Sequence, residues 1–338
     1  MKKTNYEEGW KRDLHIRWAS IVSHNNSIIV TERNNYLSKV NPNNGESFWS
    51  TKVNNSCGWI TAYEDKIYYL EQDGILKIIN FRTGIIEKEH KLYYPYLGYI
   101  IANNDYLITG SWRGYSDLTC LNNDNQFSIN WVKPTQSKEI TLYSLPVING
   151  ENMLIADNTN NYLTSIDIDT GKENWKVKLP ESIGMVDRGY TFKIHRNKII
   201  VYSKVGKIYS FSEDIMEWNC EISHTCGIRT VTPKILENQY IFQDSENFIC
   251  SYDVDDKNMR WNFLSNHVNF RIPAIEVQNG CTLVGFNMGK QKIINKEGDI
   301  VKYLKSERRY GSDFIKIRDD IFYLTKNELK QLKRKNGC

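Results

Sequence analysis

The sequence predicts an all-β protein built from one repeated unit of about forty residues. The clearest copy is 161–179, where polar and apolar residues alternate at period two, as in a half-buried strand. An Asp- and Gly-rich turn follows, and its Gly171 tolerates a positive φ. Trp175 stands four residues after this Gly and opens another strand. This pairing of a turn with a Trp recurs along the chain.

The composition is that of a folded chain with many strands. Of the 338 residues, 40% are hydrophobic and 12% aromatic, which is enough for a core and excludes a disordered protein. The 21 Tyr and 9 Trp beside only 7 Pro favour strands. The net charge of +4 is small for this length, so it permits an acidic partner without demanding nucleic acid.

The same composition leads us to expect a cytoplasmic protein. The N-terminal segment 1–10 begins with basic residues but has no apolar run behind them, as a signal peptide would. No stretch approaches the roughly eighteen apolar residues of a membrane span. The seven cysteines are an odd number, scattered and without a Cys-x-x-Cys pair, which favours reduced thiols.

Eight anchor positions define the repeat when each segment is aligned on Trp175. They lie 39 to 44 residues apart, and six are Trp while two are Lys. The anchors are Trp10, Trp49, Lys88, Trp131, Trp175, Trp218, Trp261 and Lys302. From Trp49 to Lys302, two expected strands precede each anchor: 27–30 and 36–40, 67–70 and 75–79, 106–109 and 117–121, 153–156 and 163–168, 199–202 and 207–211, 240–242 and 248–252, 282–284 and 292–294.

The two ends of the chain complement each other. The segments 321–324 and 329–332 have the pattern of two middle strands, and no last strand follows them. The segment around Trp10 is a last strand with no unit before it. Pairing the ends would close a ring and remove exposed sheet edges. We therefore predict a single domain over 1–338, an eight-bladed β-propeller of four-stranded antiparallel blades, with seven blades as the alternative if one weak unit is miscounted.

Two copies of the repeat resemble a known family. Ser165 to Trp175 matches the Asp-x-x-Thr-Gly-x-x-x-Trp motif that closes each blade in the PQQ-like (quinoprotein-type) β-propellers, and Val40 to Trp49 is a second good copy. The family includes quinone-dependent dehydrogenases and non-catalytic members such as the outer-membrane assembly lipoprotein. The chain resembles the non-catalytic branch, because no two of its cysteines are adjacent, as they are beside the quinone. The resemblance implies no enzyme activity and no cofactor.

The resemblance also implies a role for the anchor tryptophans. In this family they dock between neighbouring blades. We therefore expect a structural role for Trp49, Trp131, Trp175, Trp218 and Trp261.

Sequence patterns typical of metal and phosphate sites are weak. Cys220-x-x-x-His224-x-Cys226 lacks an evident fourth ligand, and Cys220 shares a strand face with Trp218, so no metal is expected. The acidic segments 167–171 and 253–256 resemble calcium loops, but turn formation explains them. The segment 285–290 is one residue short of a P-loop, and no helix follows it. The six histidines lie apart and suggest no triad.

A set of Arg and aromatic residues is predicted to form a protein-binding face. In a propeller, the loops before the first strand and between the second and third strands share one face of the molecule. Counting from each anchor places aromatic or Arg residues at or beside the first-strand starts and in one neighbouring loop. These residue types dominate protein–protein hot spots. The predicted contacts are Arg17, Trp18, Trp59, Tyr99, Trp112, Arg113, Tyr143, Arg188, Tyr190, Arg229, Arg271, Arg308 and Tyr310.

Three functions remain open on this reasoning. The first is a monomeric, non-catalytic propeller that docks a partner protein with an acidic patch, as an assembly scaffold or as an immunity protein that neutralises a bacterial toxin. The second is a small-ligand binder or enzyme at the channel mouth, with Arg229 and Arg271 holding an anionic group. The third is nucleic-acid binding by the basic residues of 330–335, which we expect instead to be a solvated strand edge.

Overall fold

The chain folds as an eight-bladed β-propeller with four antiparallel strands in each blade, which decides between eight and seven blades. The structure is a computed structural model. It describes residues 6–15, 19–55, 58–92, 98–111, 117–124, 126–134, 145–157, 161–181, 192–203, 205–228, 233–265, 272–277, 280–286, 290–305, 314–325 and 327–335. None of these residues belongs to a helix of the length and apolarity that crossing a membrane requires.

The blades fall into two compact units. Unit 1 comprises Met1–Ser111, Tyr115–Lys133 and Glu307–Cys338, and unit 2 comprises Trp112–Gly114 and Pro134–Ser306. Each unit holds four blades. The expectation of a single domain over the whole chain stays a prediction.

Unit 1 contains blades 1, 2, 3 and 8. Blade 1 consists of β2 (Ile21–His24), β3 (Ser27–Glu32), β4 (Tyr36–Val40) and β5 (Ser47–Lys52). Blade 2 consists of β6 (Trp59–Tyr63), β7 (Lys66–Leu70), β8 (Ile75–Asn80) and β9 (Ile86–Lys91). Blade 3 consists of β10 (Gly98–Ala102), β11 (Tyr106–Ser111), β12 (Leu118–Asn122) and β13 (Ile129–Lys133). Blade 8 consists of β30 (Ile315–Ile317), β31 (Asp320–Leu324), β32 (Glu328–Arg334) and β1 (Tyr6–Asp13).

Unit 2 contains blades 4 to 7. Blade 4 consists of β14 (Val147–Asn149), β15 (Asn152–Asp157), β16 (Tyr162–Asp167) and β17 (Glu173–Lys178). Blade 5 consists of β18 (Phe192–His195), β19 (Lys198–Tyr202), β20 (Lys207–Ser212) and β21 (Glu217–Ser223). Blade 6 consists of β22 (Lys234–Ile235), β23 (Gln239–Gln243), β24 (Phe248–Asp253) and β25 (Met259–Leu264). Blade 7 consists of β26 (Ala274–Glu276), β27 (Thr282–Phe286), β28 (Lys290–Ile294) and β29 (Ile300–Lys305).

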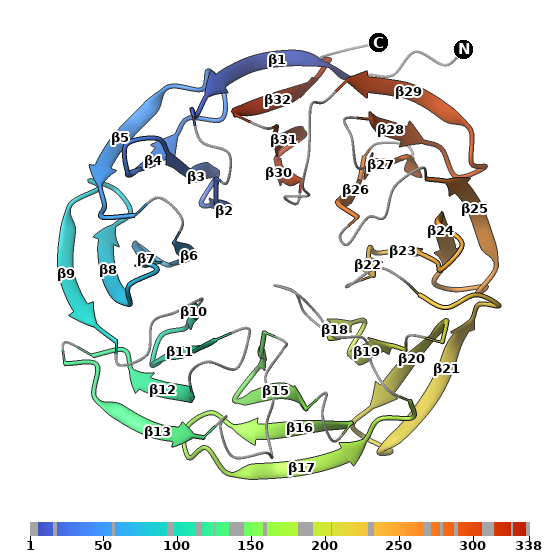
Figure 1. Cartoon of the computed structure of the whole chain (residues 1–338), viewed down its shortest axis with the longest axis horizontal. Helices are drawn as coiled ribbons and strands as arrows, with labels where there is room; N and C mark the ends of the chain where they lie inside the picture. The colour runs from blue at the N-terminus through green and yellow to red at the C-terminus, as the bar shows by residue number, and fades with distance from the viewer. Residues whose placement is uncertain are drawn as a thin grey trace. The chain divides into compact units, whose positions relative to one another are not determined.

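The N-terminal strand completes the last blade, as the sequence predicts. β1 pairs antiparallel with β32, with Tyr6 opposite Arg334 and Asp13 opposite Glu328 (Figure 1). The blade order is therefore β1-β32-β31-β30, with its outermost strand taken from the other end of the chain. This pairing satisfies the backbone groups of β32 that would otherwise form an open sheet edge.

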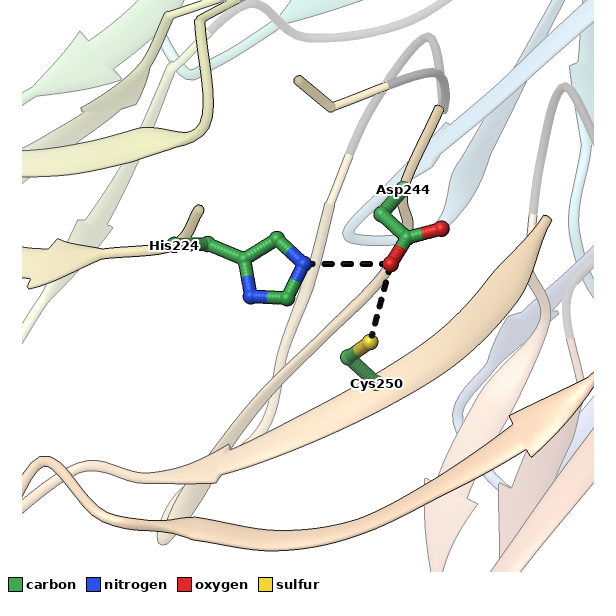
Figure 2. A group of neighbouring side chains, drawn as sticks. All are labelled: His224, Asp244 and Cys250. Carbon is green, nitrogen blue, oxygen red and sulfur yellow. Dashed lines mark hydrogen bonds and ion pairs between the residues drawn. The ribbon is translucent and has the colours of Figure 1, made fainter. Parts of the chain in front are cut away.

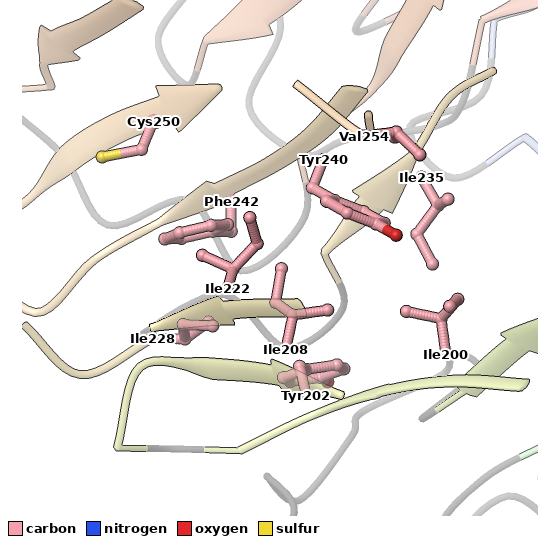
Figure 3. Close-up of a cluster of buried hydrophobic side chains, with 10 residues drawn as sticks. All are labelled: Ile200, Tyr202, Ile208, Ile222, Ile228, Ile235, Tyr240, Phe242, Cys250 and Val254. Atoms are coloured by element: carbon pink, nitrogen blue, oxygen red, sulfur yellow. The ribbon is translucent and has the colours of Figure 1, made fainter. Parts of the chain in front are cut away.

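The core of each unit lies between neighbouring blades. The second and third strands of a blade are buried on both faces, as in β7 and β8, whereas the outermost strand alternates exposed and half-buried residues, as in β9. This is why the middle strands have near-continuous apolar sequences. Figure 3 shows one such layer, in which Ile200, Tyr202 and Ile208 of blade 5 pack against Tyr240 and Phe242 of blade 6.

The Gly and the Trp of the repeat meet across neighbouring blades. Gly45 and Gly84 have φ values of +77° and +74°, and a Cβ at either position would lie 2.6 Å from a ring atom of the preceding blade's Trp. That Trp is Trp10 for Gly45 and Trp49 for Gly84. A side chain would strain the backbone and also collide with the indole. The repeat motif is therefore a contact between two blades.

Trp49, Trp175, Trp218 and Trp261 dock between blades, as the family resemblance implies, and the docking of Trp131 stays a prediction. The indole N–H of Trp49 donates to the Phe81 carbonyl of blade 2 at 3.1 Å, and that of Trp218 donates to the Lys178 carbonyl of blade 4 at 3.0 Å. Trp175 packs on Phe211 of blade 5. Trp261 is buried in the layer between blades 6 and 7. Trp131 is half-buried on β13.

Blade 2 carries Lys88 where most blades have Trp, and the facing residue differs accordingly. The Nζ atom of Lys88 lies 3.9 Å from the ring centroid of Phe127 in blade 3. Phe127 holds the turn position that is Gly in other blades, with a φ of 51°. A cation–π contact thus stands in for the packing of indole on glycine.

Candidate functional site

One hydrogen bond recurs at the end of the outermost strand in six blades. The residue directly after this strand, here called the exit residue, donates its backbone N–H to a carbonyl in the turn between the second and third strands of the same blade. These exit residues are Leu14, Val53, Leu92, Leu179, His224 and Ser265. The bond fixes the point where the chain leaves one blade for the next, here called the blade junction.

His224 is the exception among the exit residues. Leu14, Val53, Leu92 and Leu179 are aliphatic and buried, and Ser265 is a small buried residue. His224 instead carries an ionisable ring whose side chain is only 9% exposed. A buried polar group needs partners, so the neighbours of this imidazole decide what the position does.

The imidazole of His224 meets a carboxylate and a thiol of blade 6 (Figure 2). Its Nε2 lies 3.1 Å from Oδ2 of Asp244, and the Sγ of Cys250 donates to the same oxygen at 3.7 Å. Asp244 follows β23 and Cys250 lies on β24, so the adjacent blade presents both. One donor atom from each residue lies within 4.8 Å of the other two. We call these three residues the His224 cluster.

Surrounding groups fix the orientation of the His224 cluster. The hydroxyl of Tyr252 lies 2.7 Å from Nδ1 of His224, and Phe242 makes an edge contact with the ring at 5.4 Å between centroids. Oδ1 of Asp244 accepts the backbone N–H groups of Glu246 and Phe248 at 3.0 and 2.8 Å. The carboxylate thus closes its own turn with one oxygen and faces the cluster with the other.

The sequence motif Cys220-x-x-x-His224-x-Cys226 is only partly brought together. Cys220 is exposed on β21 and contributes nothing to the cluster. Cys226 is partly buried, and its pKa is raised by burial and by the charges of Glu246 and Asp244, although the Thr225 hydroxyl lowers it. Sequence reasoning missed Asp244 and Cys250. The repeat could have revealed this site, because His224 occupies the exit position at which other blades have Leu or Val.

The His224 cluster is not arranged for nucleophilic catalysis. In a catalytic triad the imidazole lies between the nucleophile and the acid, whereas here Asp244 lies between His224 and Cys250. Both ring nitrogens already have partners, so neither is free to take a proton from the thiol. Burial and the charge of Asp244 also raise the pKa of Cys250, which keeps the thiol protonated. What the cluster offers is three convergent donor atoms.

Two other junctions hold a charged pair without a histidine, buried between blades 1 and 2 and partly exposed between blades 4 and 5. Between blades 1 and 2, Glu71 accepts the backbone N–H of Asn54 at 2.7 Å and lies 3.9 Å from Nζ of Lys77. Between blades 4 and 5, Nζ of Lys207 donates to Glu181 at 2.6 Å. These are acid–base pairs, and they lack the soft ligands of the His224 cluster.

The segments that resemble calcium loops are turns. Oδ1 of Asp167 accepts the backbone N–H and the hydroxyl of Thr170 at 2.7 and 2.6 Å. Asp253 accepts the backbone N–H groups of Asp255 and Asp256, and its other oxygen pairs with Arg260. In the segment that resembles a P-loop, 287–289 lie outside the described residues.

Comparison with known proteins places the chain in a family. The family model described as outer membrane protein assembly factor BamB matches residues 3–263 and 159–301. The chain belongs to this family. Membership agrees with the PQQ-like resemblance of the repeats at 40–49 and 165–175. A search of the curated proteins finds no match.

Solved structures show the same fold at low identity. BamB from Moraxella catarrhalis aligns with a TM-score of 0.72 at 14% identity, over 98% of this chain and 99% of that chain. The computationally designed Ika8 protein aligns with a TM-score of 0.66 at 10% identity, over 95% of this chain and 96% of that one. Because a designed protein fits nearly as well as a natural family member, the likeness is one of fold.

Most of the predicted partner contacts lie outside the described residues. They are Arg17, Trp18, Trp112, Arg113, Tyr143, Arg188, Tyr190, Arg229, Arg271, Arg308 and Tyr310. The counting behind them needs correction, because β2, β14, β18, β22, β26 and β30 each begin two to five residues after the predicted start. The connections between blades vary, from six residues at 53–58 to thirteen at 134–146, so a fixed offset from the anchor fails.

The two described contacts differ in exposure. Trp59 begins β6, where it was predicted, and is half-buried against the layer between blades 2 and 3. Tyr99 on β10 is 0% exposed and meets the ring of Trp59 edge-on at 6.3 Å. Tyr99 is therefore a packing residue, and its place among the surface contacts is a correction. Trp59 keeps an accessible part.

The basic C-terminal segment lies in a paired strand. Lys330 pairs with Glu328 at 3.1 Å, and Lys335 pairs with Glu7 at 3.6 Å. Arg334 pairs with Asp319. The expected strand edge is wrong, because β32 pairs with both β1 and β31. The local balance of these charges does not favour a phosphate-binding stripe.

Proposed function

We propose that the chain is a non-catalytic protein-binding propeller. The observation that carries the proposal is membership, over most of the chain, of a family described as an assembly factor. The work of an assembly factor is to hold other proteins. The partner is a protein with an acidic patch, and this chain acts on it as a scaffold or as a neutralising inhibitor of the immunity-protein kind.

The chemistry of the described residues supports a binding role over catalysis. The buried acids Glu71 and Asp244 are both committed to turns and neighbouring side chains. A cleft of about 220 Å³ in unit 1, lined in part by Asn41, Phe48 and Arg318, is smaller than the roughly 300–1,000 Å³ of typical small-molecule sites. This cleft therefore does not support a small-molecule site at its position in unit 1, and the ligand-binding alternative at the channel mouth is tested below.

The docking face in this proposal is the one formed by the connections that lead into each blade. Trp59 is its described member, and Arg229 and Arg271 are members predicted from the sequence. The accessible part of the Trp59 indole and the guanidinium groups of Arg229 and Arg271 would together recognise carboxylates on a partner. The proposal includes a cytoplasmic location, where the free cysteines of the described residues would stay reduced.

Charge reversal tests the face. The tagged full chain captures its partner from cells of its source, and the purified pair is then titrated with wild type, Arg229→Glu/Arg271→Glu and Arg82→Glu. Arg82 is the matched control, since it is an exposed Arg in the β8–β9 turn that makes only a surface pair with Asp65. We expect a stoichiometric complex that the double variant weakens by at least about thirtyfold, as for a hot spot, and that the control leaves unchanged.

Other results would reject the proposal in distinct ways. Equal affinity for the double variant and the control would show that the face is misassigned. Capture of no protein, with a small molecule retained by the purified chain, would favour the ligand-binding alternative. Binding of DNA or RNA with an affinity that falls steeply as the salt concentration rises, and that neither variant changes, would favour the nucleic-acid alternative.

A further inference from the structure

We propose that the His224 cluster, with Cys226 as the fourth ligand, is a structural zinc site that joins blade 5 to blade 6. The sequence-based prediction of no metal rested on the spacing of Cys220, His224 and Cys226 alone. The structure replaces exposed Cys220 with two buried donors from the next blade, Asp244 and Cys250.

The donor separations fit tetrahedral zinc. Zinc binds His nitrogen, carboxylate oxygen and Cys sulfur at about 2.0–2.3 Å, so adjacent ligands in a tetrahedron lie roughly 3.3–3.8 Å apart. The distances from Oδ2 of Asp244 to Nε2 of His224 and Sγ of Cys250 are 3.1 and 3.7 Å. The Nε2 atom of His224 and the Sγ atom of Cys250 lie within 4.8 Å of each other, so this pair would approach by up to about 1 Å to complete the coordination shell.

The second shell that a zinc ligand needs is already in place. A ligating His usually donates its other ring N–H to a neighbouring acceptor, which fixes the tautomer and the ring orientation. The Tyr252 hydroxyl lies at Nδ1 of His224 at 2.7 Å, and Phe242 supports the ring. The second oxygen of Asp244 is held by two backbone N–H groups. On binding at Nε2 the imidazole proton would lie on Nδ1, which can donate a hydrogen bond to the Tyr252 oxygen, and the thiols of Cys226 and Cys250 would release their protons to solvent.

Cys226 is the candidate for the fourth ligand. It lies two residues after His224, in the connection that enters blade 6. Its Sγ atom lies 3.8 Å from the Thr225 hydroxyl and is not among the donor atoms within 4.8 Å of one another, so zinc binding requires this side chain to turn toward the cluster. This connection is tied to the β23–β24 turn, because Ser245 donates its N–H to the Gly227 carbonyl at 2.6 Å. Two thiols, one imidazole and one carboxylate form a donor set that favours zinc over magnesium or calcium.

The metal would have a structural role at this junction. Aliphatic exit residues such as Val53 and Leu92 hold their junctions by burial. His224 cannot do so, and a zinc ion would supply a bond between the exit of blade 5 and the β23–β24 turn instead. The cluster is nearly closed to solvent, with Asp244 at 4% and His224 at 9% side-chain exposure, as structural rather than catalytic zinc sites are.

The first test uses the wild-type full chain. Reduced protein is stripped with a chelator and then titrated with Zn²⁺, and separately with Co²⁺, whose absorption spectrum reports its ligands. We expect one Zn²⁺ per chain, and a Co²⁺ complex with a thiolate charge-transfer band and the intense visible bands of tetrahedral coordination. A chain that binds no Zn²⁺, or a Co²⁺ complex without the thiolate band, would overturn the proposal.

Variants then locate the ion. Cys250→Ser should weaken zinc binding by at least a hundredfold, and Cys226→Ser by at least tenfold, whereas the exposed Cys220→Ser should bind as wild type. His224→Leu places at this exit the residue that three other blades use, so it should fold, lose the zinc and lose the zinc-dependent rise in melting temperature. Zinc affinity that is unchanged in Cys250→Ser and in a folded His224→Leu protein would show that the ion binds elsewhere, and would reject the site.

Discussion

Blades 2 and 6 place a buried acid at the same point of the same turn and balance it in different ways. Glu71 and Asp244 each follow the second strand, and the backbone N–H of each donates to the first residue of the third strand, at 2.9 Å in both blades. Six residues further on, blade 2 has Lys77 and blade 6 has Cys250. The turn therefore fixes where the acid lies, while the third strand decides what faces it.

The difference shows which parts of the repeat are free to change. In blade 2 the acid finds its counter-ion within its own blade, because Lys77 lies 3.9 Å from Glu71 and also pairs with Glu89, while blade 1 adds the backbone N–H of Asn54. In blade 6 the counterpart of Lys77 is a neutral thiol, and the remaining partner, His224, comes from the preceding blade. A junction of the second kind depends on a neighbour, which makes it suited to a metal.

The largest effect should come from removing the cation of blade 2. Lys77→Met leaves Glu71 buried at 1% exposure without its counter-ion, so the free energy of unfolding should fall by about 3 kcal/mol, as for breaking a buried pair. Denaturant titration measures it. The double variant Glu71→Gln/Lys77→Met should lose clearly less than Lys77→Met alone. Equal losses in the two would show that Lys77 acts through packing.

The glycine that faces Trp49 gives the next largest effect. Gly84→Ala combines a positive φ with a Cβ 2.6 Å from the indole, so we expect a loss of about 2 kcal/mol in unfolding free energy. Gly150→Ala is the matched control, with a φ of +62° and nothing within 4 Å, and should lose about 1 kcal/mol. In blade 6 the same turn position is Lys257 at a φ of 63°, which shows that the backbone alone tolerates a side chain. Similar losses of unfolding free energy in Gly84→Ala and Gly150→Ala would show that the contact with Trp49 does not contribute.

The periodic sequence made the fold predictable, whereas the side-chain contacts at the blade junctions are not periodic and were not predicted. The Gly45 and Trp49 pattern recurs at a nearly constant interval because every blade must pack on the next. The starts of the first strands were wrong in six blades because connection length is under no such constraint. Cys250 escaped notice since it meets His224 only after blade 6 has folded against blade 5. Spacing reveals a contact between blades only where that contact is part of the repeat, and the approach of Cys250 to His224 is not.

The two blades should also differ in how pH affects their stability. Burial raises the pKa of Glu71, against the lowering effects of the Asn54 N–H and Lys77. Its folded form therefore binds protons more readily than the unfolded chain, and its contribution to stability falls as pH rises from about 4.3 through the raised pKa. For Asp253 of blade 6, burial is outweighed by the hydrogen bonds from Arg260 and the turn, and the pKa is lowered. Its contribution is present above about pH 3.9 and is lost as pH falls through the folded pKa.

Matched amide variants separate these two contributions. The stability of Glu71→Gln relative to wild type should rise between pH 4 and 8, by about 1.4 kcal/mol for each unit by which the pKa is raised. The stability of Asp253→Asn relative to wild type should rise in the opposite direction, as pH falls below 4. Unfolding free energies measured across this range test both. Slopes of the same sign would contradict the assignment of opposite pKa shifts.

The smallest effect concerns the hydroxyl that holds His224. In zinc-free protein, Tyr252→Phe removes one hydrogen bond at Nδ1 and should lower the unfolding free energy by about 1 kcal/mol. With zinc bound at Nε2 the same variant leaves a buried N–H without its acceptor, so zinc affinity should fall tenfold or more. Phe242 and Tyr252 stack with their rings 9° from parallel, and phenylalanine preserves that packing. If Tyr252→Phe lowers the unfolding free energy equally with and without zinc, Tyr252 contributes only to packing. Blade 6 would then hold Asp244 much as blade 2 holds Glu71.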